Sequence, residues 1–226
     1  MNVDITLPDG SVRNYESPVT GYQIAESIGP RLLKDAICVE IDNKFQDLSY
    51  EISESISIRI VTTKDLDALH ILRHSSAHIL AQAVLNLYPN AQFGVGPSIE
   101  NGFYYDFLFE TPIKENELEN IEKEMKSIAK SAQSFIRSEI TKKDAVKIFR
   151  NQKLKLELIE SAESDEGVGD EIVSTYANDE FIDLCMGPHV PSTSVLKHFK
   201  LTKVSGAYWR GDESNVQLQR IYGTSW

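Results

Sequence analysis

Two hydrophobic patterns divide the chain near residue 62. Over residues 1–62, apolar and polar residues alternate in short runs, which is the period of half-buried strands. VDITLPDGSVRNYE predicts two strands joined at Pro-Asp-Gly, where glycine accepts a positive φ without strain. Thr20 is a suitable N-cap for a helix over GYQIAESI, which Gly29 and Pro30 end. AICVEID and SISIRIVT predict further strands after this helix, with an Asn-Lys turn between them.

From Lys64 onward the apolar spacing becomes helical. DLDALHILRHSSAHILAQAVLNLY carries apolar residues three and four apart, which predicts an amphipathic helix that stops before Pro89. We expect the buried side of this helix to contain Leu66, Leu69, Leu72, Ile79, Leu80, Val84 and Leu87.

The rest of the chain mixes helix and strand patterns without a repeat. A loop with Gly94, Gly96 and Gly102 precedes the aromatic strand FYYDFLF. A charged helix is predicted over KENELENIEKEMKSIAKSA, and KKDAVKIFR predicts a short helix capped by Thr141. FIRSEI, EIVSTY and EFIDLC predict strands, the last two after a glycine-rich acidic turn at residues 165–170. The predicted fold class is therefore α+β, with a small unit over residues 1–62 and a larger one over residues 63–226.

Charge and composition narrow the classes of function. A net charge of −11 argues against a generic nucleic-acid binder, because phosphate neutralisation requires basic side chains. Residues 195–226 carry five basic and two acidic residues, so this segment is the best place for phosphate contacts. The sequence lacks a long apolar segment and an export signal, which predicts a cytoplasmic protein that does not contact a membrane. In that compartment we expect Cys38 and Cys185 to be thiols.

Two pairs of residues carry the candidate chemistry. In RHSSAHIL, His74 and His78 lie four apart, on one face of the predicted helix. EFIDLCMGPHV supplies Cys185 and His189, also four apart, on a turn or strand end because a Gly-Pro pair separates them. Four such donors are the ligand count of a zinc site. Ser75 stands where the HExxH metalloprotease motif has its glutamate, which excludes that motif.

A purely structural role for these residues is the alternative. The imidazoles would then cap backbone carbonyls, and Cys185 would pack as a small apolar side chain. Either pair alone fits this interpretation, and the occurrence of both pairs favours a site.

Four segments of the chain together resemble the amino-terminal half of bacterial threonyl-tRNA synthetases. They are RHSSAHILAQAV, GPSIENGFYYDF, EFIDLCMGPHVPST and KVSGAYWRGDESNVQLQRIYGTSW. The opening LPDGS and the closing ISIRIVT of residues 1–62 resemble the TGS domain, which has a ubiquitin-like fold. The resemblance implies a TGS domain followed by an editing domain related to that of alanyl-tRNA synthetase. It also implies that a catalytic core, with its own zinc and ATP-Mg sites, and an anticodon-binding domain lie beyond Trp226, so we expect a fragment.

The family resemblance assigns roles to particular residues. Editing removes serine that has been attached to tRNA(Thr), by water attack on the ester. Asp183 lies two residues from Cys185, on the same face of an extended strand, and is expected to orient a histidine or to bind the seryl ammonium. His74 is expected to hold the 2′-hydroxyl or the attacking water, and Lys155, in the alternating run KLKLEL, to supply positive charge. The implied catalytic residues are His74, His78, Lys155, Asp183, Cys185 and His189, and the implied substrate-binding residues are Gly96, Tyr104, Tyr105 and Arg210.

The same resemblance implies partners and cofactors. The partner is the acceptor end of tRNA(Thr) carrying serine, with the fragment a monomer and the full-length enzyme a homodimer. We expect editing to require no cofactor, and zinc held by His74, His78, Cys185 and His189 is the alternative. Three other functions stay open: a freestanding zinc-dependent hydrolase, a freestanding trans-editing deacylase, and a noncatalytic RNA-binding module.

Overall fold

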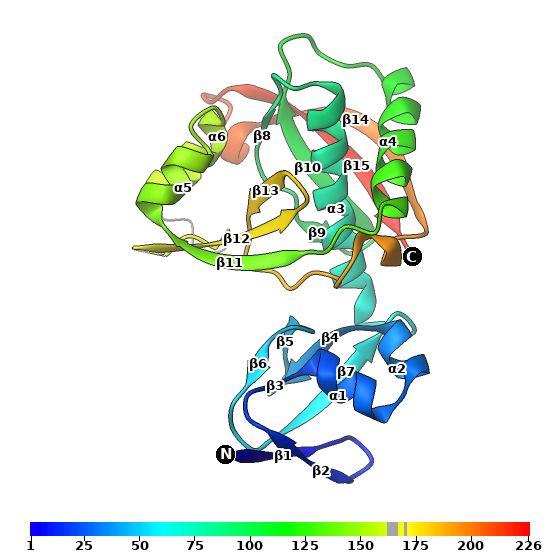
Figure 1. Cartoon of the computed structure of the whole chain (residues 1–226). Coiled ribbons are helices and arrows are strands. Elements are labelled where there is room, and N and C mark those ends of the chain that lie inside the picture. The colour runs from blue at the N-terminus through cyan, green and yellow to red at the C-terminus, as the bar shows by residue number, and fades with distance from the viewer. Residues whose placement is uncertain (162–166, 170) are drawn as a thin grey trace. The chain divides into compact units, whose positions relative to one another are not determined.

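The computed structural model describes residues 1–161, 167–169 and 171–226, which form two compact units (Figure 1). One unit comprises Met1–Ile71 with Gly187–Pro191, and the other comprises Leu72–Met186 with Ser192–Trp226. Residues 165, 166 and 170 of the predicted acidic turn lie outside the described residues. No helix in the described part of the chain is long and apolar enough to cross a membrane.

A mixed five-stranded sheet forms the first unit, in the strand order β2-β1-β7-β4-β5. Strands β1 and β7 pair in parallel, and the other neighbours pair antiparallel. Ile24 and Ala25 of helix α1 pack with Val3 and Ile5 of β1 in the core of this unit. Its elements are β1 (Asn2–Thr6), β2 (Val12–Glu16), β3 (Val19–Thr20), α1 (Gly21–Ile28), α2 (Pro30–Asp35), β4 (Ala36–Ile41), β5 (Lys44–Asp47), β6 (Glu51–Ile52) and β7 (Ile56–Thr62).

Helix α1 begins at the predicted cap. The Thr20 hydroxyl accepts a hydrogen bond from the Gln23 backbone N–H at 3.2 Å, and the Gln23 side chain accepts one from the Thr20 N–H at 2.8 Å. Helix α2 was not predicted. Helix α1 ends at Ile28 with Gly29 as its C-cap, and Pro30 begins α2, because its fixed φ suits the first position of a helix.

The second unit contains two separate sheets. One has the strand order β14-β15-β10-β8, with β9 paired to β10, and the other has the order β11-β12-β13. Figure 1 shows helices α3 and α4 lying beside the four-stranded sheet. The strands are β8 (Gln92–Phe93), β9 (Ser98–Ile99), β10 (Gly102–Leu108), β11 (Ile136–Thr141), β12 (Ile172–Asn178), β13 (Phe181–Leu184), β14 (Phe199–Tyr208) and β15 (Gln217–Ser225).

Most of helix α3, helices α4, α5 and α6, and three short 3-10 turns complete the described part of the second unit. The predicted apolar side of α4 is buried at Leu118, Ile121, Met125 and Ile128, and Thr141 caps α5 as predicted. The elements are α3 (Ala68–Leu87), η1 (Glu115–Glu117), α4 (Leu118–Lys130), α5 (Lys142–Ile148), α6 (Lys153–Ser161), η3 (Thr193–Val195) and η4 (Trp209–Gly211).

The prediction for the start of the long helix is wrong. Helix α3 begins at Ala68, and Leu66, which was expected on its buried side, is 84% exposed. The cause is a turn in which the Asp65 carboxylate accepts hydrogen bonds from the backbone N–H and the hydroxyl of Thr62, at 2.7 and 2.8 Å. Leu87, at the other end of α3, is 41% exposed, whereas Leu72, Ile79, Leu80 and Val84 are buried as predicted.

The structure decides two further segments, one with an ambiguous pattern and one for which no element was predicted. KLKLEL alternates like a strand but lies in helix α6. The basic segment at residues 195–226 forms two paired strands, β14 and β15. Cys38 and Cys185 are both buried thiols, as predicted, and burial raises the pKa of Cys38 to about 12.

Candidate functional site

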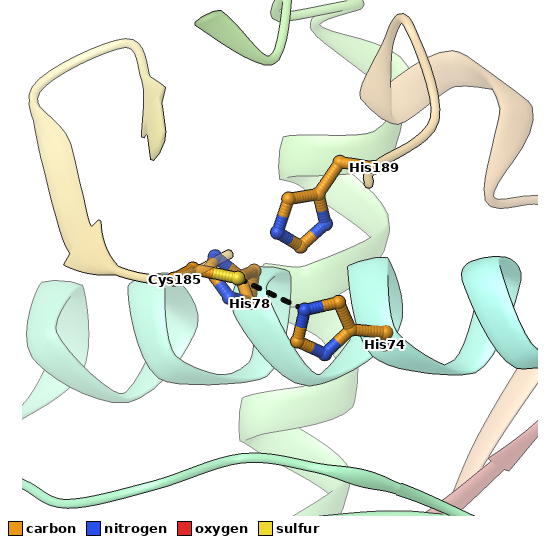
Figure 2. A group of neighbouring side chains, drawn as sticks. All are labelled: His74, His78, Cys185 and His189. Carbon is orange, nitrogen blue, oxygen red and sulfur yellow. Dashed lines mark hydrogen bonds between the residues drawn. The ribbon is translucent and has the colours of Figure 1, made fainter. Parts of the chain in front are cut away.

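Helix α3 presents two histidines to the same side (Figure 2). The rings of His74 and His78 have centroids 5.2 Å apart and an interplanar angle of 72°. This arrangement follows from their spacing, because residues four apart are neighbours on one face of a helix. His78 is 2% exposed and His74 is half-buried, so the pair reaches from the interior of the unit toward its surface.

Cys185 meets these histidines from the end of strand β13. Its sulfur lies 3.0 Å from Nε2 of His74, and its backbone N–H donates to the Ser174 carbonyl of β12 at 3.1 Å, which holds the chain extended there. Ligand atoms of His74, His78, Cys185 and His189 all lie within 4.8 Å of one another. The two predicted donor pairs therefore converge, and the four residues form a group that could hold a metal ion.

The Asp183 carboxylate is the centre of a second set of contacts. Its Oδ2 accepts a hydrogen bond from the Tyr105 hydroxyl at 2.5 Å, and its Oδ1 lies 2.5 Å from Nζ of Lys155. Nε2 of His78 lies 3.7 Å from Oδ2. Since Asp183 is 1% exposed and already engaged by three side chains, its position suits the orientation of His78 better than the binding of a substrate ammonium.

Lys155 is held in the interior by its neighbours. Its side chain is 0% exposed, and its Nζ donates to the Tyr105 hydroxyl at 3.2 Å. The same ammonium lies 4.9 Å from the centroid of the Phe93 ring and 5.7 Å from that of Tyr105. A buried ammonium is tolerated only with such compensation, so Lys155, Asp183 and Tyr105 depend on one another.

Burial and two neighbouring side chains lower the pKa of His78. Removal from water lowers the pKa of His78 well below the ordinary value of 6.5, and the nearby His74 and Lys155 lower it further. His78 is therefore neutral near pH 7, with one ring nitrogen able to accept a proton or a metal ion.

The two predicted tyrosines are separated by the structure. Adjacent residues on a strand point to opposite faces, and Tyr104 and Tyr105 are neighbours on β10. Tyr105 faces Asp183 and Lys155, as described above. The ring of Tyr104 instead has the Arg220 guanidinium 3.8 Å from its centroid and the Tyr222 ring at 5.7 Å.

Gly96 and Arg210, the other two predicted substrate contacts, also lie outside the His/Cys group. A side chain at Gly96 would collide with the ring of Tyr105, so this glycine allows the backbone to approach that ring. Arg210 is exposed in η4, and its guanidinium donates to the Ser161 hydroxyl at 2.5 Å.

Sequence reasoning missed three residues next to these groups. Phe93 supports Lys155. Arg220 forms a two-point ion pair with buried Asp106, at 2.7 and 2.8 Å, and Tyr222 packs against Tyr104. Arg220 had a signal in the sequence as a member of the basic segment, and Tyr222 lies with it in the last of the four segments that carry the family resemblance.

Comparisons with known proteins agree with this architecture. Residues 3–62 match the TGS domain family, and residues 173–222 match the family described as "Threonyl and Alanyl tRNA synthetase second additional domain". Proteins named "Threonine--tRNA ligase" are similar over 99% of the chain, with 49% identity in Francisella philomiragia and 52% in Burkholderia multivorans and in Paraburkholderia xenovorans.

The chain is homologous to threonine-tRNA ligases. It spans about a third of the length of these curated relatives, 35% in each case. The predicted fold class, a TGS domain followed by an α+β domain of the synthetase editing type, is confirmed. The matched part of the second domain contains Asp183, Cys185 and His189. The domain boundary after residue 62 and the roles of the site residues stay predictions.

Proposed function

We propose that this chain is the proofreading part of a threonine-tRNA ligase and hydrolyses serine from seryl-tRNA(Thr). The homologues are threonine-tRNA ligases, and the second domain is of a type associated with editing. A site that activates threonine distinguishes it from serine by one methyl group, worth about 1–3 kcal/mol or 10 to 200-fold. A second, hydrolytic site is the physical means of improving that discrimination.

The reaction is hydrolysis of an ester. The oxygen of water forms a bond to the carbonyl carbon of the seryl group, and the bond from that carbon to the ribose oxygen of the terminal adenosine breaks. The proton lost by water goes first to a neutral imidazole and then to the departing ribose oxygen. Serine and intact tRNA leave, and the site returns to its starting protonation.

His74 is the proposed group that accepts this proton or holds the 2′-hydroxyl. It is half-buried, in contrast to His78, so water and substrate reach it more easily. His78 and Cys185 are proposed to fix its position, through the ring contact and the 3.0 Å contact to sulfur. Asp183 orients His78, and Lys155 pairs with the Asp183 carboxylate and adds positive potential where an oxyanion develops.

The tRNA is proposed to contact strands β14 and β15 and the neighbouring turn. Lys203 lies with its ammonium 4.5 Å from the Tyr222 ring centroid, in a row that continues through Tyr104 to Arg220. Aromatic rings flanked by cations suit contact with nucleotides, by stacking and by phosphate neutralisation. Arg210 is proposed to add a further phosphate contact.

Zinc-dependent hydrolysis of the same ester is the alternative mechanism. His74, His78, Cys185 and His189 are residue types that zinc accepts, and Asp183 beside His78 resembles a carboxylate that orients a metal-bound imidazole. Bound zinc would supply Lewis acidity and a more acidic water. We favour hydrolysis by water that the side chains hold, because the His78-Asp183-Lys155 contacts already supply a neutral imidazole and positive charge.

A deacylation assay tests the proposal. The chain is expected to release serine from seryl-tRNA(Thr) and to leave threonyl-tRNA(Thr) intact. His74→Ala should lower the rate at least about 100-fold, the contribution of one general base. The matched control is His70→Ala, because His70 lies exposed on the same helix outside the His/Cys group. Equal rates for His74→Ala and the parent chain would remove the site assignment, and equal release of serine from a simple seryl ester would favour a small-substrate hydrolase.

A further inference from the structure

A cavity of about 730 Å³ lies on the second unit among helices α3, α4 and α5 and the turn between β12 and β13. Its described lining includes none of the six proposed catalytic residues. The volume is within the usual range of small-molecule pockets, about 300–1,000 Å³. The proposed function leaves this cavity without a role.

The lining combines apolar side chains with acidic ones. Buried Phe149 and Phe181 and half-buried Leu85 and Ile182 supply apolar surface. Three acids, Glu124, Asp179 and Glu180, also line it. Among the described lining residues there is no lysine, arginine or histidine, which is unfavourable for a phosphate or for RNA and favourable for a cation.

A cluster of three side-chain amides lies beside the turn. Asn178 donates to the Gln82 side chain at 2.6 Å, and Gln82 donates to Gln133 at 3.0 Å, with Gln82 and Gln133 both in the cavity lining. Asn178 is 0% exposed, and its Oδ1 accepts no hydrogen bond within the described part of the chain. Asn178 itself lies outside the cavity lining, and its side-chain N–H groups donate to Gln82 and Gln133, which do line the cavity. Gln82 and Gln133 therefore bring side-chain amides to the same cavity lining as the carboxylates of Asp179 and Glu180.

The cavity and the candidate catalytic group share two aromatic rings. Phe93 and Phe181 both line the cavity, with ring centroids 5.5 Å apart. Phe93 also lies against the Lys155 ammonium at 4.9 Å, and Phe181 meets the ring of His78 edge-on at 6.2 Å. Because close-packed rings transmit small displacements, a ligand that presses on this pair changes the surroundings of Lys155 and His78.

We propose that this cavity is a second ligand site, which binds a small organic cation with a flat apolar body and transmits its occupancy to His78 through Phe93 and Phe181. The apolar rings receive the body of the ligand, and the carboxylates receive its charged N–H groups. The inference goes beyond ester hydrolysis, and its binding step does not depend on that activity.

Benzamidine and benzamide provide a matched pair of probes, since both have a phenyl ring of the same size but only benzamidine carries a positive amidinium. We expect benzamidine to cause saturable changes in the amide NMR signals of cavity residues in the full chain. Benzamide should bind more weakly by up to about fivefold, the upper value for a pair at a solvated surface. The ring nitrogen signals of His78 should shift together with the benzamidine titration.

Three substitutions test whether benzamidine binds in this cavity. Ser127→Trp places an indole in the cavity from an exposed position on α4 and should abolish both the amide changes and the His78 shift. Glu180→Gln should weaken benzamidine binding several-fold, whereas Glu119→Gln, on the α4 surface outside the cavity, should leave it unchanged. Equal binding of benzamide and benzamidine, undiminished binding by Ser127→Trp, or binding that leaves the His78 signals in place would overturn the proposal. If the parent chain binds benzamidine but does not deacylate seryl-tRNA(Thr), that result would count against the proposed function alone.

Discussion

Lys155 and Asp183 form an ion pair from which water is excluded: Nζ and Oδ1 are 2.5 Å apart, and the side chains are 0% and 2% exposed. The pair joins helix α6 to strand β13, and through Asp183 it reaches His78. Removal of one charge would leave the other buried and uncompensated, which makes this contact the most sensitive point of the candidate site.

The first prediction concerns the stability of this pair. Lys155→Met should lower the free energy of unfolding by about 3–5 kcal/mol, because it leaves the Asp183 carboxylate buried without its cation. The double variant Lys155→Met/Asp183→Asn should lose less than the sum of the two single losses, by on the order of 0.5–3 kcal/mol. Urea denaturation of the four proteins measures this coupling. Strictly additive losses would mean that the two charges do not stabilise each other.

A second prediction separates the two adjacent tyrosines. Tyr105→Phe removes a hydroxyl that donates to Asp183 and accepts from Lys155, so it should cost about 1–3 kcal/mol of stability and slow deacylation. Tyr104→Phe keeps the ring on which Arg220 lies and should change stability by less than about 0.5 kcal/mol. Denaturation and single-turnover deacylation of both variants provide the comparison. Similar losses in the two would contradict the opposite orientations assigned to these side chains.

The depressed pKa of His78 predicts how stability changes with pH. In the unfolded chain His78 takes up a proton near its ordinary pKa of 6.5, and in the folded chain it does so only at lower pH. The unfolded state therefore binds more protons just below pH 6.5, and stability falls as the pH decreases through that range, by up to about 1.4 kcal/mol per pH unit.

Denaturation between pH 7.5 and lower values measures this loss, and His78→Gln should reduce the slope. The ring nitrogen shifts of His78, followed by NMR, give an independent measurement. A His78 imidazole that titrates at or above pH 6.5 in the folded chain would disprove the assignment.

Metal content is the subject of the fourth prediction. We expect seryl-tRNA(Thr) deacylation to persist in protein that has been purified without added zinc and treated with a chelator, because the side chains are proposed to hold the attacking water. Elemental analysis and activity are measured on the same sample. Stoichiometric zinc that leaves together with activity, and restores it on return, would assign the metal to the four-residue group.

The last prediction concerns contact with tRNA. Arg210→Ala should weaken tRNA binding and reduce the slope of log affinity against log salt by about one, if Arg210 neutralises one phosphate. Lys147→Ala provides a control, because Lys147 lies on α5 in an exposed pair with Asp144. An unchanged salt slope for Arg210→Ala would give Arg210 a structural role through Ser161.

Local features of the fold were predictable from the sequence. Thr20 and Thr141 each cap a helix where expected, because a cap depends on contacts within three residues. Leu66 was misplaced although its spacing was helical, because Asp65 and Thr62 form a turn that competes with the first helical turn. The pattern KLKLEL also did not distinguish a strand from a helix. Six alternating residues fit a strand or a short helix, and the packing of Leu154 and Leu158 decides for the helix.

For the candidate site, the sequence by itself determined which residues could carry chemistry and that His74 and His78 share a helical face, since spacing of four residues fixes that relation locally. Only the tertiary structure decided which distant groups meet them. Tyr105, Lys155 and Asp183 lie on three different elements, and their mutual contacts require the sheets and helices of the second unit to pack. Burial also determines their chemistry, because exclusion of water makes Lys155 depend on Asp183 and keeps His78 neutral.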